Sequence, residues 1–249
     1  MSVSTRLVNL VIDAADPQRL AAFWAGLLGW RIALTDPGEV VVRAPAGDGW
    51  DLDICFVPVR EPKTVQNRIH LDLASATARA QAERVAAARG LGARPVDIGQ
   101  GDVPWEVLAD PEGNEFCVLE PRPIYQNCGA VAAIVYAAAD PGRLASFWAE
   151  AGGWRPARTS APFPALRAPA GVGPWLEFVP AGEPAPVKNR LHLDVAPPQG
   201  GDHGHAAEWL IGLGARRADV GQGDAPWHVL TDPEGNEFCV LGPRDHPPR

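Results

Sequence analysis

A tandem duplication is the feature that most constrains this sequence. The segment DIGQGDVPWEVLADPEGNEFCVLEPR at 97–122 returns at 219–244 as DVGQGDAPWHVLTDPEGNEFCVLGPR, with 21 of 26 positions identical at a constant offset of 122. Each copy contains two short apolar runs joined by a DPEG tetrapeptide, in which Asp, Pro and Gly suit positions i, i+1 and i+3 of a type I turn. The pattern predicts a β-hairpin that closes each of two related repeats.

Within each repeat, the apolar pattern predicts the order strand, helix, strand, strand, strand, and predicts it twice. Val8–Ala14 is typical of a strand, Asp16 and Pro17 supply an N-cap and a first-turn proline, and Gly29 ends a helix with one apolar face. A second strand and helix follow near 67–74 and 77–89, then a short strand near 94–98 and the hairpin. We therefore expect an α+β fold built from four βαβββ modules.

Length and composition limit the classes of protein. The 249 residues, 46% of them hydrophobic, suffice for two cores, which we place at 1–122 and 130–249 with a linker at 123–129. No apolar run reaches the roughly 18 residues of a membrane-spanning helix, and the N-terminus lacks a signal-peptide layout, so we expect a cytoplasmic protein. A net charge of -8 without a Lys/Arg cluster argues against nucleic acid or a membrane as partner.

Charged residues alternate along one strand of each repeat. Alternation places three polar side chains on one face of each strand and apolar residues on the other; these are Arg68, His70 and Asp72, and Arg190, His192 and Asp194. A dry core cannot hold such groups unpaired. Two interpretations stay open: a ligand-facing polar cavity, or an internal Arg–Asp pair that orders the strand.

Other candidate residues lie on the closing hairpins and near tryptophans. Glu115 and Cys117 share one strand face, as do Glu237 and Cys239. One interpretation is that they point into the same polar cavity as the histidines. The other is that the glutamate is exposed and the cysteine is a small buried apolar residue. The four cysteines form no C-x-x-C pair, which argues against a zinc-finger or disulfide framework. Four tryptophans could form the floor of a ligand pocket or belong to the core: Trp50, Trp105, Trp175 and Trp227.

Three motifs together resemble a known superfamily. They are an Asp-Pro helix ending in Phe-Trp-x4-Gly-Trp, an N-R-x-H-L-D strand and the D-P-E-G-N-x-F hairpin, and they resemble the vicinal oxygen chelate superfamily, in particular its glyoxalase-like, bleomycin-resistance-related branch. The resemblance covers both repeats. It implies cupped mixed sheets with helices outside, each cup made of two βαβββ modules, and in many members a divalent metal inside the cup.

The metal-ligand positions implied by the resemblance are only partly preserved. The first-strand position falls on Asn9 and Ala133, the middle-strand position on His70 and His192, the fourth-strand position on Cys55 and Glu177, and the closing-strand position on Cys117 and Cys239. Only the histidine of the His/His/Glu set is present in each repeat. We therefore expect no cofactor, with a divalent metal as the alternative, held by residues among His70, Cys117, His192, Glu177 and Cys239.

Two functions are consistent with this pattern. The first is a binding protein for a small organic ligand, with Arg68 or Arg190 holding an anionic group and with Asn9, Glu115, Glu237 and the tryptophans contacting the ligand. The second is a glyoxalase, lyase or dioxygenase type of enzyme that uses a metal or acid–base chemistry of His70, His192, Asp72 and Asp194. One repeat could also be only a scaffold. Whether modules pair within or across repeats, and whether the chain is a pseudo-dimeric monomer or a homodimer, stay open.

Overall fold

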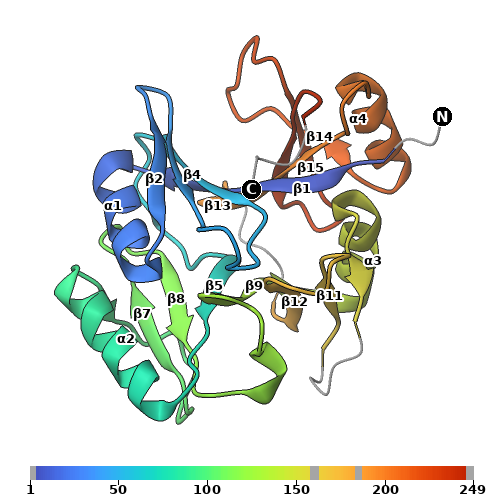
Figure 1. Ribbon diagram of the computed structural model, residues 1–249. Helices are drawn as coiled ribbons and strands as arrows, with labels where there is room; N and C mark the ends of the chain where they lie inside the picture. The colour runs from blue at the N-terminus through green and yellow to red at the C-terminus, as the bar shows by residue number, and fades with distance from the viewer. Residues whose placement is uncertain (1–3, 158–162, 183–186, 245–249) are drawn as a thin grey trace.

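A computed structural model describes residues 4–157, 163–182 and 187–244. It contains two eight-stranded mixed sheets, here called sheet A and sheet B (Figure 1). Sheet A has the order β14-β15-β16-β13-β1-β4-β3-β2. Its strands are β1 (Arg6–Ala14), β2 (Arg31–Thr35), β3 (Val40–Arg43), β4 (Asp53–Pro58), β13 (Leu191–Ala196), β14 (Arg216–Arg217), β15 (His228–Thr231) and β16 (Glu237–Val240).

Sheet B repeats this plan with the other strands, in the order β10-β11-β12-β9-β5-β8-β7-β6. They are β5 (Ile69–Leu73), β6 (Arg94–Pro95), β7 (Glu106–Ala109), β8 (Glu115–Val118), β9 (Val131–Ala138), β10 (Arg155–Pro156), β11 (Ala165–Arg167) and β12 (Trp175–Pro180). The predicted α+β fold of βαβββ modules in mixed sheets is thus confirmed. The strand predicted near 94–98 is shorter than expected: β6 covers Arg94 and Pro95, and the Val96 N–H makes one further hydrogen bond to the Val107 carbonyl of β7.

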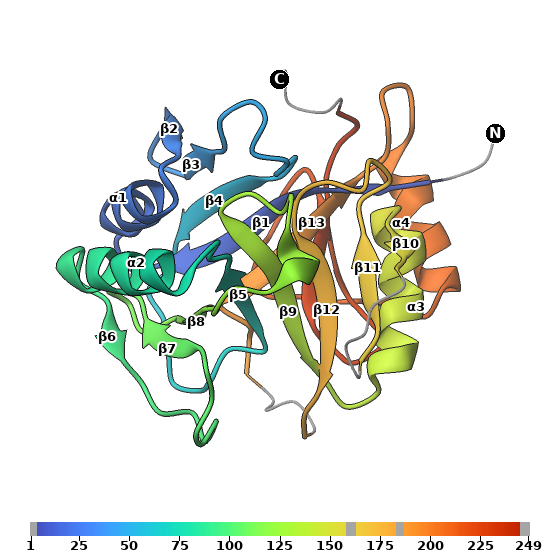
Figure 2. The same ribbon diagram turned by 60° about the horizontal axis from the view of Figure 1, so that its bottom comes forward.

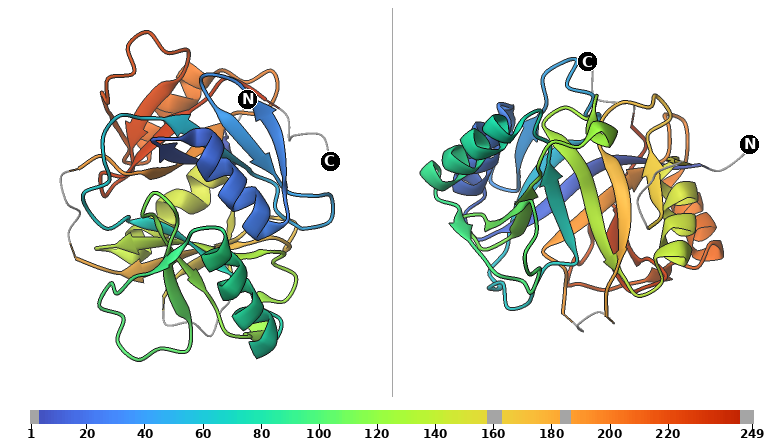
Figure 3. Two further views of the ribbon diagram at one scale, coloured as in Figure 1. Left: turned by 90° about the vertical axis from the view of Figure 1, so that its left-hand side faces the viewer. Right: turned by 90° about the horizontal axis from the view of Figure 1, so that it is seen from below.

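Each sheet combines one half of each repeat, which answers the question of module pairing. In the middle of sheet A, β1 pairs antiparallel with β13, so that Leu10 lies opposite Leu193. In sheet B, β5 pairs with β9, and Leu71 lies opposite Ile134. The right-hand view of Figure 3 shows the teal β5 of the first repeat beside the yellow-green β9 and the orange β12 of the second in one sheet. The modules therefore pair across the repeats.

Four α-helices of the described chain cover the outer faces of the sheets (Figure 2). Helices α1 and α4 contact strands of sheet A, whereas α2 packs on β8 and α3 on β12 of sheet B. Their bounds are α1 (Pro17–Leu28), α2 (Ala78–Gly90), α3 (Pro141–Gly152) and α4 (His203–Gly212). None of these helices combines the length and apolar character that crossing a membrane requires.

The first helix of each repeat begins and ends as its sequence predicts. The Asp16 carboxylate accepts a hydrogen bond from the Arg19 N–H, and Pro17 opens α1. Gly29 follows the helix with a φ of 71°, a left-handed conformation that a residue with a Cβ adopts only with strain. Because α1 and its counterpart α3 start at the ends of β1 and β9, these caps fix the angle between strand and helix.

A single apolar cluster fills the space between the helices and both sheets. Trp24 of α1 packs edge-on against Phe116 of β8 at 5.1 Å between ring centroids, and Trp148 of α3 packs on Phe238 of β16 at 5.4 Å. These contacts join the two modules of one repeat, which belong to different sheets. The core therefore connects sheet A to sheet B through the helices.

The DPEGN turns add polar contacts at the same junction. The buried Asp110 carboxylate accepts hydrogen bonds from the Trp24 indole N–H at 3.2 Å and from the backbone N–H of Asn114 at 2.9 Å. Asp232 does the same with Trp148 and Asn236. Burial raises the pKa of Asp232 to about 6, opposed by these hydrogen bonds. Each turn is thus held to the first helix of its own repeat.

The glutamate of each turn holds three groups at once. Glu234 accepts hydrogen bonds from the backbone N–H groups of Ala139 and Asp140, at 2.9 and 2.6 Å, and pairs with Arg68 of the other repeat at 3.0 Å. Glu112 repeats the arrangement with Ala15, Asp16 and Arg190. These ion pairs are nearly buried and join the repeats.

We predict that Glu234→Ala lowers the free energy of unfolding by about 3–5 kcal/mol, because it leaves Arg68 in a buried position without its carboxylate partner. Urea denaturation measures this change. The matched control is Glu83→Ala, which removes an exposed ion pair with Arg79 and should change stability by less than about 1 kcal/mol. Equal effects of the two substitutions would show that the buried pair is not a structural joint.

Candidate functional site

The inner face of sheet A gathers polar side chains from both repeats. Alternation along β1 points Asn9 to the face opposite the core residue Leu10, and alternation along β13 points His192 and Asp194 the same way. The antiparallel register places Asn9 opposite Asp194, and the parallel register of β16 places Cys239 beside Asp194. The cup of sheet A therefore contains a polar group of four residues that neither repeat could form alone.

The distances within this group are short. The Asn9 Nδ2 donates to Asp194 Oδ2 at 3.1 Å. The other oxygen, Oδ1, lies 3.6 Å from His192 Nε2 and has no hydrogen-bond partner among the described residues. The Cys239 sulfur lies 3.7 Å from His192 Nε2. One donor atom each from His192, Asp194 and Cys239 lies within 4.8 Å of the other two.

Burial shifts the protonation equilibria of these groups. It raises the pKa of Asp194 to about 7, although the Asn9 hydrogen bond opposes the shift. It lowers the pKa of His192 to about 3, with a further contribution from the positive charge of Lys188. Burial and the neighbouring Asp194 raise the pKa of the Cys239 thiol. In the free protein near neutral pH, His192 is therefore a neutral imidazole and Cys239 a neutral thiol.

A cavity of about 670 Å³ opens over this polar group. Its size is within the range of small-molecule sites in proteins. Apolar and polar side chains share its lining, and Trp227, one of the lining residues, is 40% exposed. The apolar wall residues are Val11, Val57, Val59, Val220, Val229 and Leu241, and the polar ones include Asn9, Asp13, Glu39, Lys188, His192, Asp194, Glu237 and Arg244.

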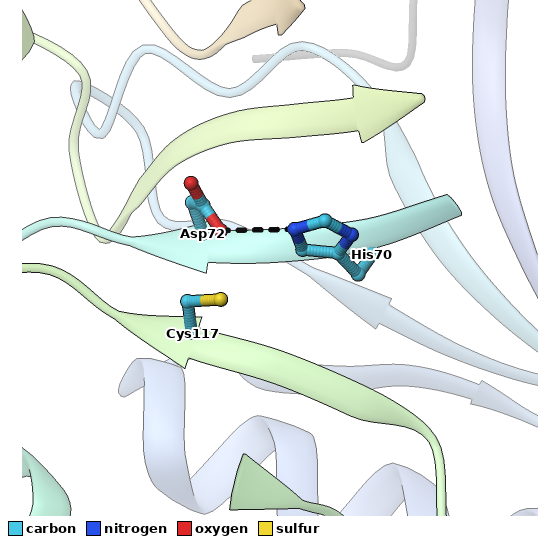
Figure 4. Close-up of side chains that lie close together, drawn as sticks. All are labelled: His70, Asp72 and Cys117. Carbon is cyan, nitrogen blue, oxygen red and sulfur yellow. Dashed lines mark ion pairs between the residues drawn. The ribbon is translucent and has the colours of Figure 1, made fainter. Parts of the chain in front are cut away.

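Sheet B carries an equivalent group, shown in Figure 4. His70 and Asp72 come from β5 and Cys117 from the neighbouring β8, and one donor atom of each lies within 4.8 Å of the others. His70 Nε2 lies 3.4 Å from Asp72 Oδ1, which has no hydrogen-bond partner among the described residues. Ala133 occupies the position opposite Asp72 that Asn9 occupies opposite Asp194. Nothing at that position holds the Asp72 carboxylate.

The linker between the repeats enters the cup of sheet B. A short 3-10 helix, η1 (Pro123–Tyr125), places Tyr125 in the apolar cluster on this face, and its hydroxyl donates to the Glu177 carboxylate at 3.0 Å. Burial and the nearby Asp72 raise the pKa of Glu177 to about 7. Burial likewise raises the pKa of Tyr125. Tyr125 therefore occupies space in sheet B that the cavity keeps open in sheet A.

Arginine side chains lie over the rings of two tryptophans beside sheet B. The Arg122 guanidinium lies over the Trp105 ring at 5.2 Å, and Arg167 lies over Trp175 at 4.7 Å. Trp227, which corresponds to Trp105 at the offset of 122, instead borders the open cavity of sheet A. The two cups thus contain equivalent polar groups but differ in the aromatic contacts around them.

Comparison with known proteins identifies the family. A family model described as "Glyoxalase-like domain" matches residues 9–119 and again 133–241, which together make up most of the chain. The chain belongs to this glyoxalase-like family. None of the curated proteins searched matches the sequence.

Two solved structures show how far the fold of this glyoxalase-like protein extends. Glyoxalase I from Zea mays superposes with a TM-score of 0.65 at 14% identity, covering 96% of this chain and 92% of the maize chain. A candidate dioxygenase from Bacillus subtilis superposes with a TM-score of 0.60 at 13% identity, covering 98% and 87% of the two chains. At these identities the likeness shows the fold, including both repeats, and leaves activity undetermined.

The glyoxalase-like fold implies a divalent metal, and the residues present fit one of a particular kind. Each cup offers one imidazole nitrogen, one carboxylate oxygen and one sulfur. Asp72 Oδ1 and Asp194 Oδ1 are buried and unpartnered among the described residues, as expected of a carboxylate whose partner is an ion. The mixed set with sulfur suits zinc better than Mg²⁺ or Mn²⁺, which prefer oxygen ligands. The donor set differs from the His/His/Glu set because Asp194 and Asp72 take part.

Several residues predicted from sequence as ligand contacts have other partners in the structure. Arg68 and Arg190 pair with Glu234 and Glu112 of the opposite repeat, and neither lines the cavity of sheet A. Glu115 pairs with Lys63, and Trp50 packs against Trp30 at 5.3 Å in the main core. We therefore leave these four out of the candidate site. Asn9, Trp227, Glu237, His192, Asp194 and Cys239 do line the cavity.

Two groups at the cups were not expected from the sequence. Tyr125 lies in a linker without hydrophobic periodicity, and its only signal is being the sole aromatic residue between the repeats. Lys188 forms an ion pair with Asp13 at the edge of the sheet A cavity. The chain has only two lysines, and this scarcity could have marked Lys188 as a residue with a particular partner.

The raised pKa of Glu177 predicts a pH-dependent effect of Glu177→Gln. The unfolded carboxyl titrates near pH 4.3, whereas the folded one titrates near 7, so the native state binds the additional proton between these values. Wild-type stability therefore falls as pH rises through this window. The glutamine of the variant does not titrate and can still accept the Tyr125 hydrogen bond. Relative to wild type, the variant should gain up to about 3 kcal/mol between pH 4.5 and pH 8.

Denaturation at several pH values, with a chelator present, measures this gain. Glu106→Gln on the exposed edge of β7 is the control, and its stability difference from wild type should not vary with pH. A constant difference for Glu177→Gln across the same range would contradict the assignment of a raised pKa to this buried carboxyl.

Proposed function

We propose that this glyoxalase-like protein binds a small organic ligand in the cup of sheet A. The observation that carries the proposal is the cavity of about 670 Å³, which is lined by this polar group together with apolar and charged side chains from both repeats. Clefts of this size and composition are the usual form of small-molecule sites. The cup of sheet B has the same polar group, but Tyr125 contacts Glu177 there. We therefore expect one ligand per chain.

The lining indicates the chemistry of the ligand. Asp194 Oδ1 and the His192 ring can exchange hydrogen bonds with a hydroxyl or carbonyl group, which would satisfy the unpartnered carboxylate oxygen. Trp227 and the valines suit an aromatic or alicyclic body. Carboxylates outnumber cations in the lining, with Asp13, Asp36, Glu39, Asp194 and Glu237 against Lys188 and Arg244, which disfavours an anionic ligand. A hydroxylated or keto-substituted ring compound without large net charge fits these features best.

A thermal-shift screen of aromatic and hydroxylated ring compounds tests the proposal, followed by calorimetric titration of the compounds that bind. Ligand at 100 times its Kd should stabilise the native state by about 2.7 kcal/mol. Trp227→Ala removes one aromatic contact and should weaken binding by roughly twofold to tenfold. Val57→Trp should fill the cavity and weaken binding more strongly, because Val57 lines it.

The duplication supplies matched controls for both substitutions. Trp105→Ala and Val179→Trp change the corresponding positions of the sheet B cup and should leave the Kd unchanged. If the sheet B variants lose the ligand and the sheet A variants keep it, the site has been assigned to the wrong cup. If the full panel produces no binding compound, the binding proposal itself is wrong for this ligand class.

A catalytic use of the same cup is the second candidate. It is favoured by the geometry of Asp194 and His192, a carboxyl and an imidazole 3.6 Å apart that both line the cavity and can exchange a proton with a bound ligand. For any compound that the protein converts, Asp194→Asn should stop turnover and change the Kd by less than about tenfold. Unchanged turnover in this variant would exclude Asp194 as the acid or base.

A further inference from the structure

We propose that His203 and His228 form a binding site for a divalent transition-metal ion on the outer face of sheet A, away from both cups. Zinc and copper(II) represent the class of ion that it takes. His203 is the first residue of α4, and His228 is the first residue of β15. The site is independent of the ligand proposed for the cup.

Strand geometry turns His228 away from the cup of sheet A. His228 lies opposite Val240 of β16, a fully buried member of the main apolar cluster. The next residue, Val229, lies opposite Cys239 and lines the cup cavity. Because neighbouring residues of a strand point to opposite faces, the His228 ring lies on the outer side of the sheet. Helix α4 packs on this side against β15 and β16 (Figure 1).

The two imidazole rings lie against one another. Their centroids are 5.0 Å apart, and the angle between their planes is 30°. Two imidazoles bound tetrahedrally to one zinc ion at nitrogen–zinc distances of about 2.0–2.1 Å have centroids roughly 5 Å apart. Rotation about the Cβ–Cγ bond of a histidine is soft, so a nitrogen of each ring can turn toward a shared ion. Helix α4 and strand β15 thus hold the rings at the spacing that such an ion requires.

The nitrogen atoms of both rings are free to bind an ion. Within the described part of the chain, no hydrogen bond joins the imidazole of His203 or His228 to another group. His228 Nε2 lies 3.9 Å from the point that a Cβ of Gly204 would occupy, which places this nitrogen beside the first turn of α4. Both histidines are partly exposed, so an ion can enter from solvent and water can complete its coordination.

A carboxylate supplies negative charge beside the rings. Asp202 is the N-cap of α4 and accepts a hydrogen bond from the His205 N–H at 2.7 Å. Asp202 and Glu208 both act electrostatically on His228, and Glu208 forms an ion pair with Arg217. Asp202 therefore offsets the positive end of the helix dipole, which by itself disfavours a cation.

The protonation state and the donor type indicate which ions bind. Partial burial and the nearby His203 lower the pKa of His228 below the ordinary value of histidine. The His228 ring is therefore neutral at neutral pH and can bind a metal without first losing a proton. A pair of imidazoles favours Cu²⁺ and Zn²⁺ over Mg²⁺ and Ca²⁺, which prefer oxygen ligands.

The first repeat has no counterpart of this site. At the offset of 122, Gln81 and Glu106 stand where the second repeat has His203 and His228. The Gln81 side-chain amide donates to the Pro104 carbonyl at 3.0 Å. We therefore expect one external ion per chain, bound to the second repeat.

Titration of the full-length protein with zinc chloride, followed by long-range proton–nitrogen NMR spectra of the imidazole rings, tests the proposal. The signals of His203 and His228 should shift together along one binding curve. Magnesium chloride at the same concentration should leave them unchanged. The signals of His70 and His192 report separately on the two cups, so metal bound there is not counted.

Single substitutions test whether the two rings share the ion. His203→Ala and His228→Ala should each weaken zinc binding at the remaining ring by at least about tenfold. His205→Ala is the matched control: its ring is 83% exposed and lies 3.7 Å from Asp202, and this variant should keep the wild-type Kd. Circular dichroism checks that each variant is folded, and glutamine replaces alanine in any variant that is not.

The other outcomes would overturn the proposal. Signals of His203 and His228 that do not respond to zinc, or that respond equally to magnesium, would show that the pair is not a transition-metal site. Weaker binding in only one of the two variants would also overturn it, because a shared ion needs both rings. Weaker binding in His205→Ala would contradict the choice of ligands. The ligand screen is run with a chelator present, so failure of either proposal is seen separately.

Discussion

Backbone hydrogen bonds between β1 and β13, and between β5 and β9, join the two repeats in the middle of each sheet. The register of these pairs decides which side chains share a cup. It places Asn9 of the first repeat against Asp194 of the second, and Ala133 of the second against Asp72 of the first. Neither cup belongs to one repeat. The two cups differ because each combines a first strand with a middle strand from the other copy.

The DPEGN turns keep the two sheets in place relative to one another. Asp110 and Asp232 bind the indole N–H of the first helix in their own repeat, while Glu112 and Glu234 bind an arginine of the other repeat. Buried carboxylates are tolerated at these positions because donors surround them. The most similar segments of the duplication therefore act as joints of the fold, and their cysteines Cys117 and Cys239 also reach the cups.

The sequence allowed the modules, the helix from Asp16 to Gly29 and the shared face of His70 and Asp72 to be predicted, because strand and helix periodicity are local properties. It did not allow the partner of Arg68 to be predicted, because Glu234 lies 166 residues away in the other repeat. Nor could the sequence place Trp50, which packs on Trp30 in the core and also borders a cavity of about 720 Å³ separate from the polar groups of the cups. Tyr125 was missed because its position depends on where the linker crosses sheet B.

The central claim is that the candidate site is assembled from both repeats, with Asn9, His192, Asp194 and Cys239 in one cup. Nuclear Overhauser effects between backbone protons of uniformly labelled protein test it most directly. The account predicts cross-strand effects linking Leu10 to Leu193 and Leu71 to Ile134. Effects linking Leu10 to Leu71 and Ile134 to Leu193 instead would show that the modules pair within each repeat, and would contradict the composition of both cups.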